Sequence, residues 1–183
     1  MKPAVFLDRD GTLNAEVGYL SREEDLHLLP GAAMAVAKLN AQGIPVIVVT
    51  NQSGIGRGYY GWREFTTVMN RMETLLAMEH AHLDAVYAAP HHEDGQGEYA
   101  VADHPDRKPN AGMLQRAAEE HDLDLQRSWM VGDKAIDVEA GRRAGCRTCL
   151  VQTGYGSEEG DCGADLVVMD LAEAVDRILA MWP

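Results

Sequence analysis

The sequence predicts a three-layer α/β fold in which helices cover both faces of a doubly wound parallel sheet. Short apolar runs alternate with longer segments of helical periodicity, which is typical of repeated strand–helix units. Most runs are apolar at consecutive positions, which indicates strands covered on both faces. Clusters of polar residues follow the apolar runs. This places them at the carboxyl ends of the strands, where ligands bind in such folds.

The chain is expected to contain six strands and five helices. The runs predicted as strands are Ala4–Leu7, Pro45–Val49, Ala85–Ala89, Trp129–Val131, Thr148–Val151 and Leu166–Val168. The segments predicted as helices are Ala32–Leu39, Arg63–Glu79, Ala111–Glu120, Ile136–Ala144 and Leu171–Met181. In the longest helix, the stripe that includes Phe65 and Met69 is interpreted as core packing. No repeat or low-complexity linker breaks this order, so we expect one domain over residues 1–183.

The composition favours a globular protein that binds a small anion. Hydrophobic residues make up 46% of the 183 residues, and the formal net charge is −13. Such an acidic surface repels nucleic-acid phosphates and anionic lipids, so neither nucleic acid nor membrane is expected as a partner. Five cationic residues instead lie in the loops considered below as the active site and would form a cationic pocket. They are Arg9, Arg57, Arg107, Lys108 and Lys134.

The sequence also favours a cytoplasmic monomer. The three cysteines form no CxxC pair, and an odd number fits a reducing compartment. No apolar stretch approaches the ~20 residues of a membrane span. The N-terminal apolar run is cut short by Asp8, unlike that of a signal peptide. The sequence contains no heptad seam of the kind that would indicate an obligate oligomer. The segment Ser157–Gly163 is interpreted as a polar loop without an assigned function.

The first predicted strand ends in two carboxylates, Asp8 and Asp10. Side chains at positions i and i+2 point the same way as long as the strand geometry continues. Gly11 then permits a sharp turn. Because aspartate also stabilises ordinary turns, this pair alone is modest evidence for a catalytic site.

The second predicted strand is followed by small hydrogen-bonding side chains and a flexible glycine, which together can hold phosphate oxygens. These residues are Thr50, Asn51, Gln52, Ser53 and Gly54. An ordinary polar turn is the simpler interpretation of this segment by itself.

Two later clusters add charged groups. Lys108 lies just before Pro109 and a predicted helix, where a cation gains nothing from the helix dipole. Unless it is solvated, it needs an anionic partner such as a phosphate. Asp133 ends the fourth predicted strand and Asp137 follows in the next helix, so both carboxylates can face one point. Helix capping explains one of these aspartates better than it explains two with Lys134 between them.

Together, these motifs resemble those of the haloacid dehalogenase superfamily of aspartate-nucleophile phosphohydrolases. The resemblance rests on DxDGT at residues 8–12, Thr50-Asn51, Lys108 and GDxxxD at residues 132–137, each after its own predicted strand. It implies a Rossmann-like sheet. Related phosphatases often carry a cap domain inserted after the first or second motif. Predicted core elements occupy most of both intervals here, so a capless protein is expected.

The resemblance implies a phosphatase that forms an aspartyl-phosphate. Asp8 would be the nucleophile, and Asp10 would protonate the leaving alcohol and later deprotonate the attacking water. Mg²⁺, which prefers oxygen ligands, would be held by Asp8, Asp133 and the backbone carbonyl of Asp10. Lys108 would stabilise charge on the transferring oxygens.

Two further residues, Lys134 and Asp137, are implied to support this arrangement. The acid at position 10 also indicates the class of reaction. Relatives that displace halide lack an acid at this position, whereas an alcohol leaving group needs a proton. The pattern therefore favours phosphate ester hydrolysis.

At residues 8–12, 50–58, 90–92, 107–109 and 132–134, the sequence more closely resembles the D-glycero-D-manno-heptose 1,7-bisphosphate phosphatases. This resemblance implies that the protein removes the 7-phosphate of that phosphorylated sugar. The product of this reaction feeds the inner core of lipopolysaccharide or other glycan precursors. Histidinol-phosphate phosphatases share almost the same motifs, so histidinol phosphate or another small metabolite is the alternative substrate. A non-catalytic binding protein is the remaining alternative. The implied substrate contacts are Arg9, Glu16, Val17, Gly18, Tyr19, Thr50, Asn51, Gln52, Ser53, Arg57, Arg107 and Lys108.

Both groups of relatives usually bind a structural zinc in the loop after the third strand, through CxH and a later CxC. The four corresponding positions here are Ala89, His91, His104 and Asp106. His91, His104 and Asp106, together with the neighbouring His92, offer nitrogen and oxygen ligands that zinc accepts. The cysteines of the relatives, and with them their thiolates, are missing. We therefore expect a loop without a bound metal.

Overall fold

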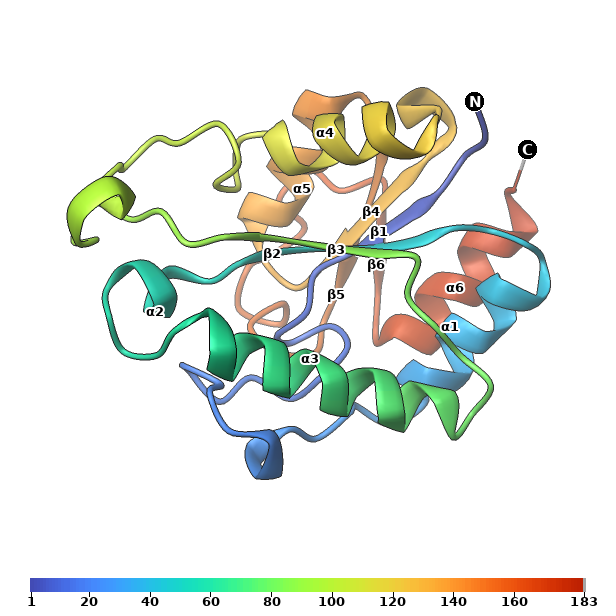
Figure 1. Ribbon diagram of the computed structural model, residues 1–183. Helices are drawn as coiled ribbons and strands as arrows, with labels where there is room; N and C mark the ends of the chain where they lie inside the picture. The colour runs from blue at the N-terminus through green and yellow to red at the C-terminus, as the bar shows by residue number, and fades with distance from the viewer. Residues whose placement is uncertain (183) are drawn as a thin grey trace.

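The computed structural model describes residues 1–182, so the last residue of the predicted 1–183 domain lies outside the described part. Within this part, six parallel strands form one sheet in the order β3-β2-β1-β4-β5-β6 (Figure 1). The strands are β1 (Val5–Leu7), β2 (Val46–Asn51), β3 (Ala85–Ala89), β4 (Trp129–Gly132), β5 (Arg147–Val151) and β6 (Leu166–Val168). The predicted doubly wound α/β sheet is confirmed.

The helices also lie where the sequence predicts them. They are α1 (Ala32–Ala41), α3 (Trp62–Ala77), α4 (Gly112–His121), α5 (Ala135–Ala144) and α6 (Leu171–Ala180), and their ends differ from the predicted ends by at most two residues. The short helix α2 (Ser53–Gly56) and three 3₁₀ turns were not predicted. The turns are η1 (Glu23–Asp25), η2 (Gly97–Tyr99) and η3 (Leu125–Arg127). Elements this short carry no readable periodicity.

Helices cover both faces of the sheet. Helices α1, α3 and α6 pack on one face, and α4 and α5 pack on the other (Figure 1). Along β1, Val5 and Leu7 join the core on the first face, whereas Phe6 joins the core on the second. A strand whose consecutive side chains are buried on opposite faces must be apolar at every position, which explains the continuous runs.

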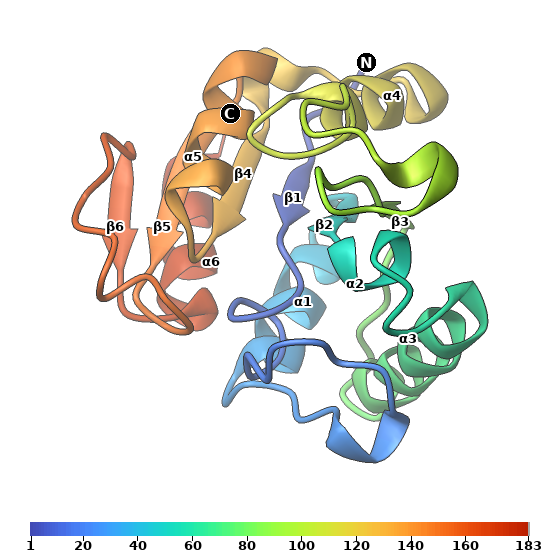
Figure 2. The same ribbon diagram turned by 90° about the vertical axis from the view of Figure 1, so that its left-hand side faces the viewer.

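The order of the strands fixes where a ligand can bind. From β1 the chain moves outward to β2 and β3, and β4 leads in the opposite direction to β5 and β6. Open α/β sheets bind ligands at the carboxyl ends of the strands where this order reverses, which here is between β1 and β4. Figure 2 looks onto this edge of the sheet, with β1 and β4 at its centre.

No cap domain interrupts the described residues. The interval 15–44 holds η1 and α1, and the interval 54–107 holds most of α2, all of α3 and β3, and η2. Helices α1 and α3 pack on the sheet, and β3 belongs to it, so these elements are parts of the core layers. Among the helices of residues 1–182, none combines the length and the apolar character needed to cross a membrane.

Candidate active site

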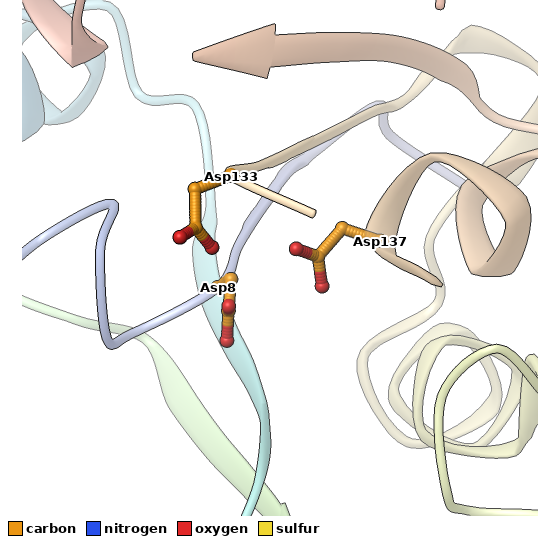
Figure 3. A group of neighbouring side chains, drawn as sticks. All are labelled: Asp8, Asp133 and Asp137. Atoms are coloured by element: carbon orange, nitrogen blue, oxygen red, sulfur yellow. The ribbon is translucent and has the colours of Figure 1, made fainter. Parts of the chain in front are cut away.

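Three buried aspartates meet at the carboxyl ends of β1 and β4. Asp8 follows β1, Asp133 follows β4, and Asp137 lies in the first turn of α5. Each offers a carboxylate oxygen, and these oxygens lie within 4.8 Å of one another. Figure 3 shows the three side chains close together, with the carboxylates of Asp133 and Asp137 directed toward Asp8. The sequence predicts that Asp133 and Asp137 face one point, and the structure confirms it.

A buried lysine balances part of this negative charge. The ammonium of Lys108 lies 2.9 Å from Asp8 Oδ1 and 2.6 Å from Asp137 Oδ1, and it donates a 2.8 Å hydrogen bond to the carbonyl of Val49. Its three protons therefore have three acceptors within the protein. Burial disfavours the ammonium, but the charges of Asp137 and Asp8 outweigh this and raise the pKa of Lys108 above its ordinary value. The anionic partners that the sequence requires for Lys108 thus include two aspartates.

The carboxylate oxygens of Asp137 and Asp133 differ in whether they have hydrogen-bond partners. Asp137 uses one oxygen for Lys108 and accepts a hydrogen bond from the backbone N–H of Lys134 with the other. Asp133 accepts a hydrogen bond from the backbone N–H of Tyr155 through Oδ2, whereas its buried Oδ1 has no partner. Burial and the charge of Asp8 raise the pKa of Asp133 to about 7. A buried carboxylate oxygen without a partner, beside a surplus of negative charge, fits a divalent cation.

Asp10 stands apart from this group. Strand β1 ends at Leu7 and the chain turns at Gly11, whose φ is 81°, so the strand geometry does not continue to Asp10. The carboxylate instead pairs with the buried guanidinium of Arg9 at 2.9 Å and accepts a hydrogen bond from Asn14 Nδ2 at 3.0 Å. Asp8 and Asp10 therefore occupy different surroundings at the same site.

A cavity of about 400 Å³ opens over these residues. The predicted site residues that line it are Asp8, Asp10, Glu16, Gly18, Tyr19, Thr50, Asn51, Gln52, Ser53, Arg107, Lys108 and Lys134. Three other predicted substrate contacts are not among the lining residues. Arg9 is buried and paired with Asp10, Val17 is exposed, and Arg57 donates a 2.7 Å hydrogen bond to the hydroxyl of Tyr19.

The sequence is similar to curated phosphatases along nearly its whole length. The D-glycero-D-manno-heptose-1,7-bisphosphate 7-phosphatase of Thermosynechococcus vestitus is 49% identical over 188 residues, which cover 97% of this chain and 95% of that protein. The corresponding phosphatase of Mesorhizobium japonicum is 52% identical over 143 residues, which span 78% of this chain and 66%, just under two thirds, of that protein. Residues 106–174 match the HAD-hydrolase-like family model. The chain belongs to the haloacid dehalogenase (HAD) family of phosphatases.

Solved structures of HAD phosphatases share the fold of this one. The crystal structure of D,D-heptose 1,7-bisphosphate phosphatase from B. bronchiseptica, complexed with magnesium and phosphate, has a TM-score of 0.87 and 32% identity, and the match covers 99% of each chain. A HAD-like phosphatase from Mesorhizobium loti also has a TM-score of 0.87, with 42% identity over 100% of this chain and 88% of that one. The predicted family and fold class are therefore confirmed.

In this HAD phosphatase, the segment after β5 contacts Asp133 and two segments next to the aspartates. Besides the Tyr155 hydrogen bond to Asp133, the Thr153 hydroxyl donates to the carbonyl of Gly11 at 2.6 Å. Glu159, in the loop for which the sequence indicates no function, accepts a 3.0 Å hydrogen bond from the backbone N–H of Ala135 at the start of α5. Sequence patterns miss this contribution because most of these contacts involve backbone atoms.

The loop after β3 contains the four residues considered as zinc ligands. The rings of His91 and His104 stack with centroids 3.4 Å apart. Asp106 pairs with Arg116, and His92 Nδ1 accepts a hydrogen bond from the backbone N–H of residue 94. Within residues 1–182, the three aspartates form the only group of three side chains close enough to share a metal ion. The expectation that the loop binds no zinc stays a prediction.

Proposed function

We propose that this HAD phosphatase removes the 7-phosphate of D-glycero-D-manno-heptose 1,7-bisphosphate in a Mg²⁺-dependent reaction. One observation carries the choice of substrate: a relative with this named activity is 49% identical and aligns over 95% of its own length. The proposal includes the expectation, drawn from the sequence, of a cytoplasmic monomer without nucleic-acid or membrane partners. The buried, incompletely paired aspartates support the assignment of the chemistry to this site.

The proposed reaction uses two carboxylates in turn. A carboxylate oxygen of Asp8 attacks phosphorus and forms an acyl phosphate while the bond from phosphorus to the ester oxygen breaks. Asp10 gives its proton to the departing alkoxide and so releases the sugar alcohol. Asp10 then takes a proton from water, the resulting hydroxide attacks phosphorus, and Asp8 is released with inorganic phosphate. The separate surroundings of Asp8 and Asp10 support these two roles.

The remaining groups offset the repulsion between the nucleophile and an anionic substrate. Mg²⁺ would be held by Asp8, Asp133 and the backbone carbonyl of Asp10, and it would supply positive charge to the phosphoryl oxygens. Lys108 keeps one oxygen of Asp8 fixed at 2.9 Å. Asp137 fixes Lys108 in turn, at 2.6 Å.

A second phosphate on the substrate has a cationic partner in the cavity. Arg107 lines the cavity and donates one hydrogen bond to the carbonyl of His91. Burial, followed by the nearby charge of Arg57, lowers the pKa of Arg107 below its usual value. A phosphate placed beside Arg107 would compensate both effects, so we assign the 1-phosphate to this end of the cavity.

Mg²⁺ is expected to stabilise the protein through Asp133. At a concentration about 100 times the dissociation constant, binding adds about 2.7 kcal/mol, which corresponds to a rise in Tm of about 5–10 °C for a domain of this size. In Asp133→Asn the rise should disappear, because the partnerless oxygen is the proposed ligand. Without metal this variant should be no less stable than the parent, since the repulsion from Asp8 is removed. Calorimetry with EDTA or Mg²⁺ measures both effects, and an undiminished shift in the variant would contradict the proposed ligand.

The substrate is tested by competition between two phosphate esters. We expect kcat/KM for the heptose bisphosphate to exceed that for histidinol phosphate by about a hundredfold, or about 2.7 kcal/mol of transition-state binding. The physical reason is the second phosphate, which only the heptose ester presents to Arg107. Phosphate release with Mg²⁺ gives both constants. Equal or reversed values would overturn the substrate and leave the phosphatase chemistry intact.

A further inference from the structure

The Asp10 carboxylate depends on a glutamine for one of its hydrogen bonds. Gln52 is 2% exposed. Its Nε2 donates to Asp10 Oδ2 at 3.2 Å and to the hydroxyl of Thr50 at 2.8 Å. Both amide protons of Gln52 therefore have acceptors in the protein. The Asp10 contact requires that Nε2, and not Oε1, faces the carboxylate.

Tyr60 sets this orientation of the Gln52 amide. Its hydroxyl lies 2.5 Å from Gln52 Oε1 and donates to it, and Arg9 Nη2 approaches the same oxygen at 3.4 Å. Burial raises the pKa of Tyr60 to about 12, although the charge of Arg9 works against this. The phenol therefore keeps its proton at neutral pH and remains a hydrogen-bond donor to Gln52.

The backbone makes room for the Tyr60 ring. A Cβ atom at Gly54 would lie 2.2 Å from Tyr60 Cε1 and 2.8 Å from Tyr19 Cδ1. Only glycine at position 54 lets the ring pass this close to α2 and reach Gln52. Tyr60 also lines the active-site cavity itself. Its position is thus fixed by packing, as a positioning role requires.

We propose that Tyr60 is a positioning residue for Asp10 that acts through Gln52. The inference rests on the proposed role of Asp10 as the proton donor to the leaving alcohol. Without the Tyr60 hydroxyl, only the 3.4 Å contact with Arg9 Nη2 holds Gln52 Oε1, so the amide can turn over and present its oxygen to the Asp10 carboxylate. Two acceptors would then face each other, and Asp10 would leave the place from which it reaches the leaving group.

Tyr60→Phe tests the proposal with two esters that differ in their need for a proton. For the heptose bisphosphate, whose leaving group is an alkoxide, kcat/KM should fall about tenfold, the effect of a lost hydrogen bond that aligns the acid. For p-nitrophenyl phosphate, which releases a weakly basic phenolate, kcat/KM should change less than about twofold. This constant covers only the steps up to formation of the acyl phosphate, so it excludes the later action of Asp10 on water. Tyr59→Phe is the matched control, because it removes a neighbouring hydroxyl that is outside the network.

A double-variant cycle provides the second measurement. Gln52→Met removes the amide at nearly constant volume, and adding Tyr60→Phe to it should lower kcat/KM no further if Tyr60 acts through Gln52. Additive losses, or equal losses on both esters, would overturn the positioning role. A parent enzyme without activity on either ester would instead refute the proposed function. Circular dichroism and Tm values for each variant distinguish these outcomes from misfolding.

Discussion

Replacing Asp8 with asparagine is expected to abolish phosphate release, with a loss in kcat of about 10⁴-fold or more, as for other covalent nucleophiles. The amide has nearly the shape of the carboxylate but cannot form the acyl phosphate. The fold should persist, because an amide oxygen can still accept the 2.8 Å hydrogen bond from the backbone N–H of Arg9. Rapid-quench and steady-state phosphate assays measure the loss.

Stability measurements separate this chemical effect from a structural one. Burial, followed by the charge of Asp8, raises the pKa of both Asp133 and Asp137, so removal of the Asp8 charge relieves repulsion. In the metal-free Asp8→Asn variant, weaker pairing with Lys108 should lower the free energy of unfolding, and the relief of repulsion should offset part of this loss. Urea unfolding measures the net change. Asp84→Asn is a matched control at the opposite edge of the sheet, where the carboxylate accepts a 2.7 Å hydrogen bond from Val46. It should keep its kcat, because the amide oxygen can still accept this hydrogen bond and the residue lies away from the cavity. Turnover by Asp8→Asn within tenfold of the parent enzyme would show that Asp8 is not the nucleophile.

The sequence predicts the fold and the meeting place of the aspartates because both depend on strand ends. A strand buried on both faces must be a continuous apolar run, and the polar residues after such runs must lie at one edge of a parallel sheet. Asp8, Asp133 and Asp137 satisfy both conditions, so their proximity follows from the pattern. The same reasoning finds the segment 50–53, whereas Lys108 is found as a cation placed just before a helix. Both line the cavity, as does Asp8.

Contacts set by exact chain geometry are beyond such reasoning. Asp10 follows Asp8 by two residues and would point the same way in a continued strand, but the strand ends one residue before Asp8. Its partner is then Arg9, which the resemblance implies as a substrate contact. Tyr155 contributes a backbone N–H, which every residue except proline has, so no side-chain pattern marks it. Tyr60 is found only through a 2.5 Å contact with a side chain eight residues away.

The second large effect is expected from Lys108→Met. This change leaves Asp8 and Asp137 buried without their common counter-charge, and breaking a buried ion pair in this way costs about 3–5 kcal/mol of stability. We also expect kcat/KM to fall about a hundredfold or more, since the cation beside the proposed nucleophile Asp8 is lost. Urea unfolding and phosphate release measure the two effects. Lys38→Met, which breaks an exposed pair with Asp176, should cost less than about 1 kcal/mol.

A double variant distinguishes the structural from the catalytic contribution of Lys108. Asp137→Asn removes the more deeply buried of the two stranded charges and leaves an amide oxygen to accept the N–H of Lys134. In combination with Lys108→Met it should therefore restore part of the lost stability, which double-mutant analysis detects as non-additivity. The activity should not return, because no cation is regained beside Asp8. Recovery of activity together with stability would mean that Lys108 serves only to neutralise the buried aspartates.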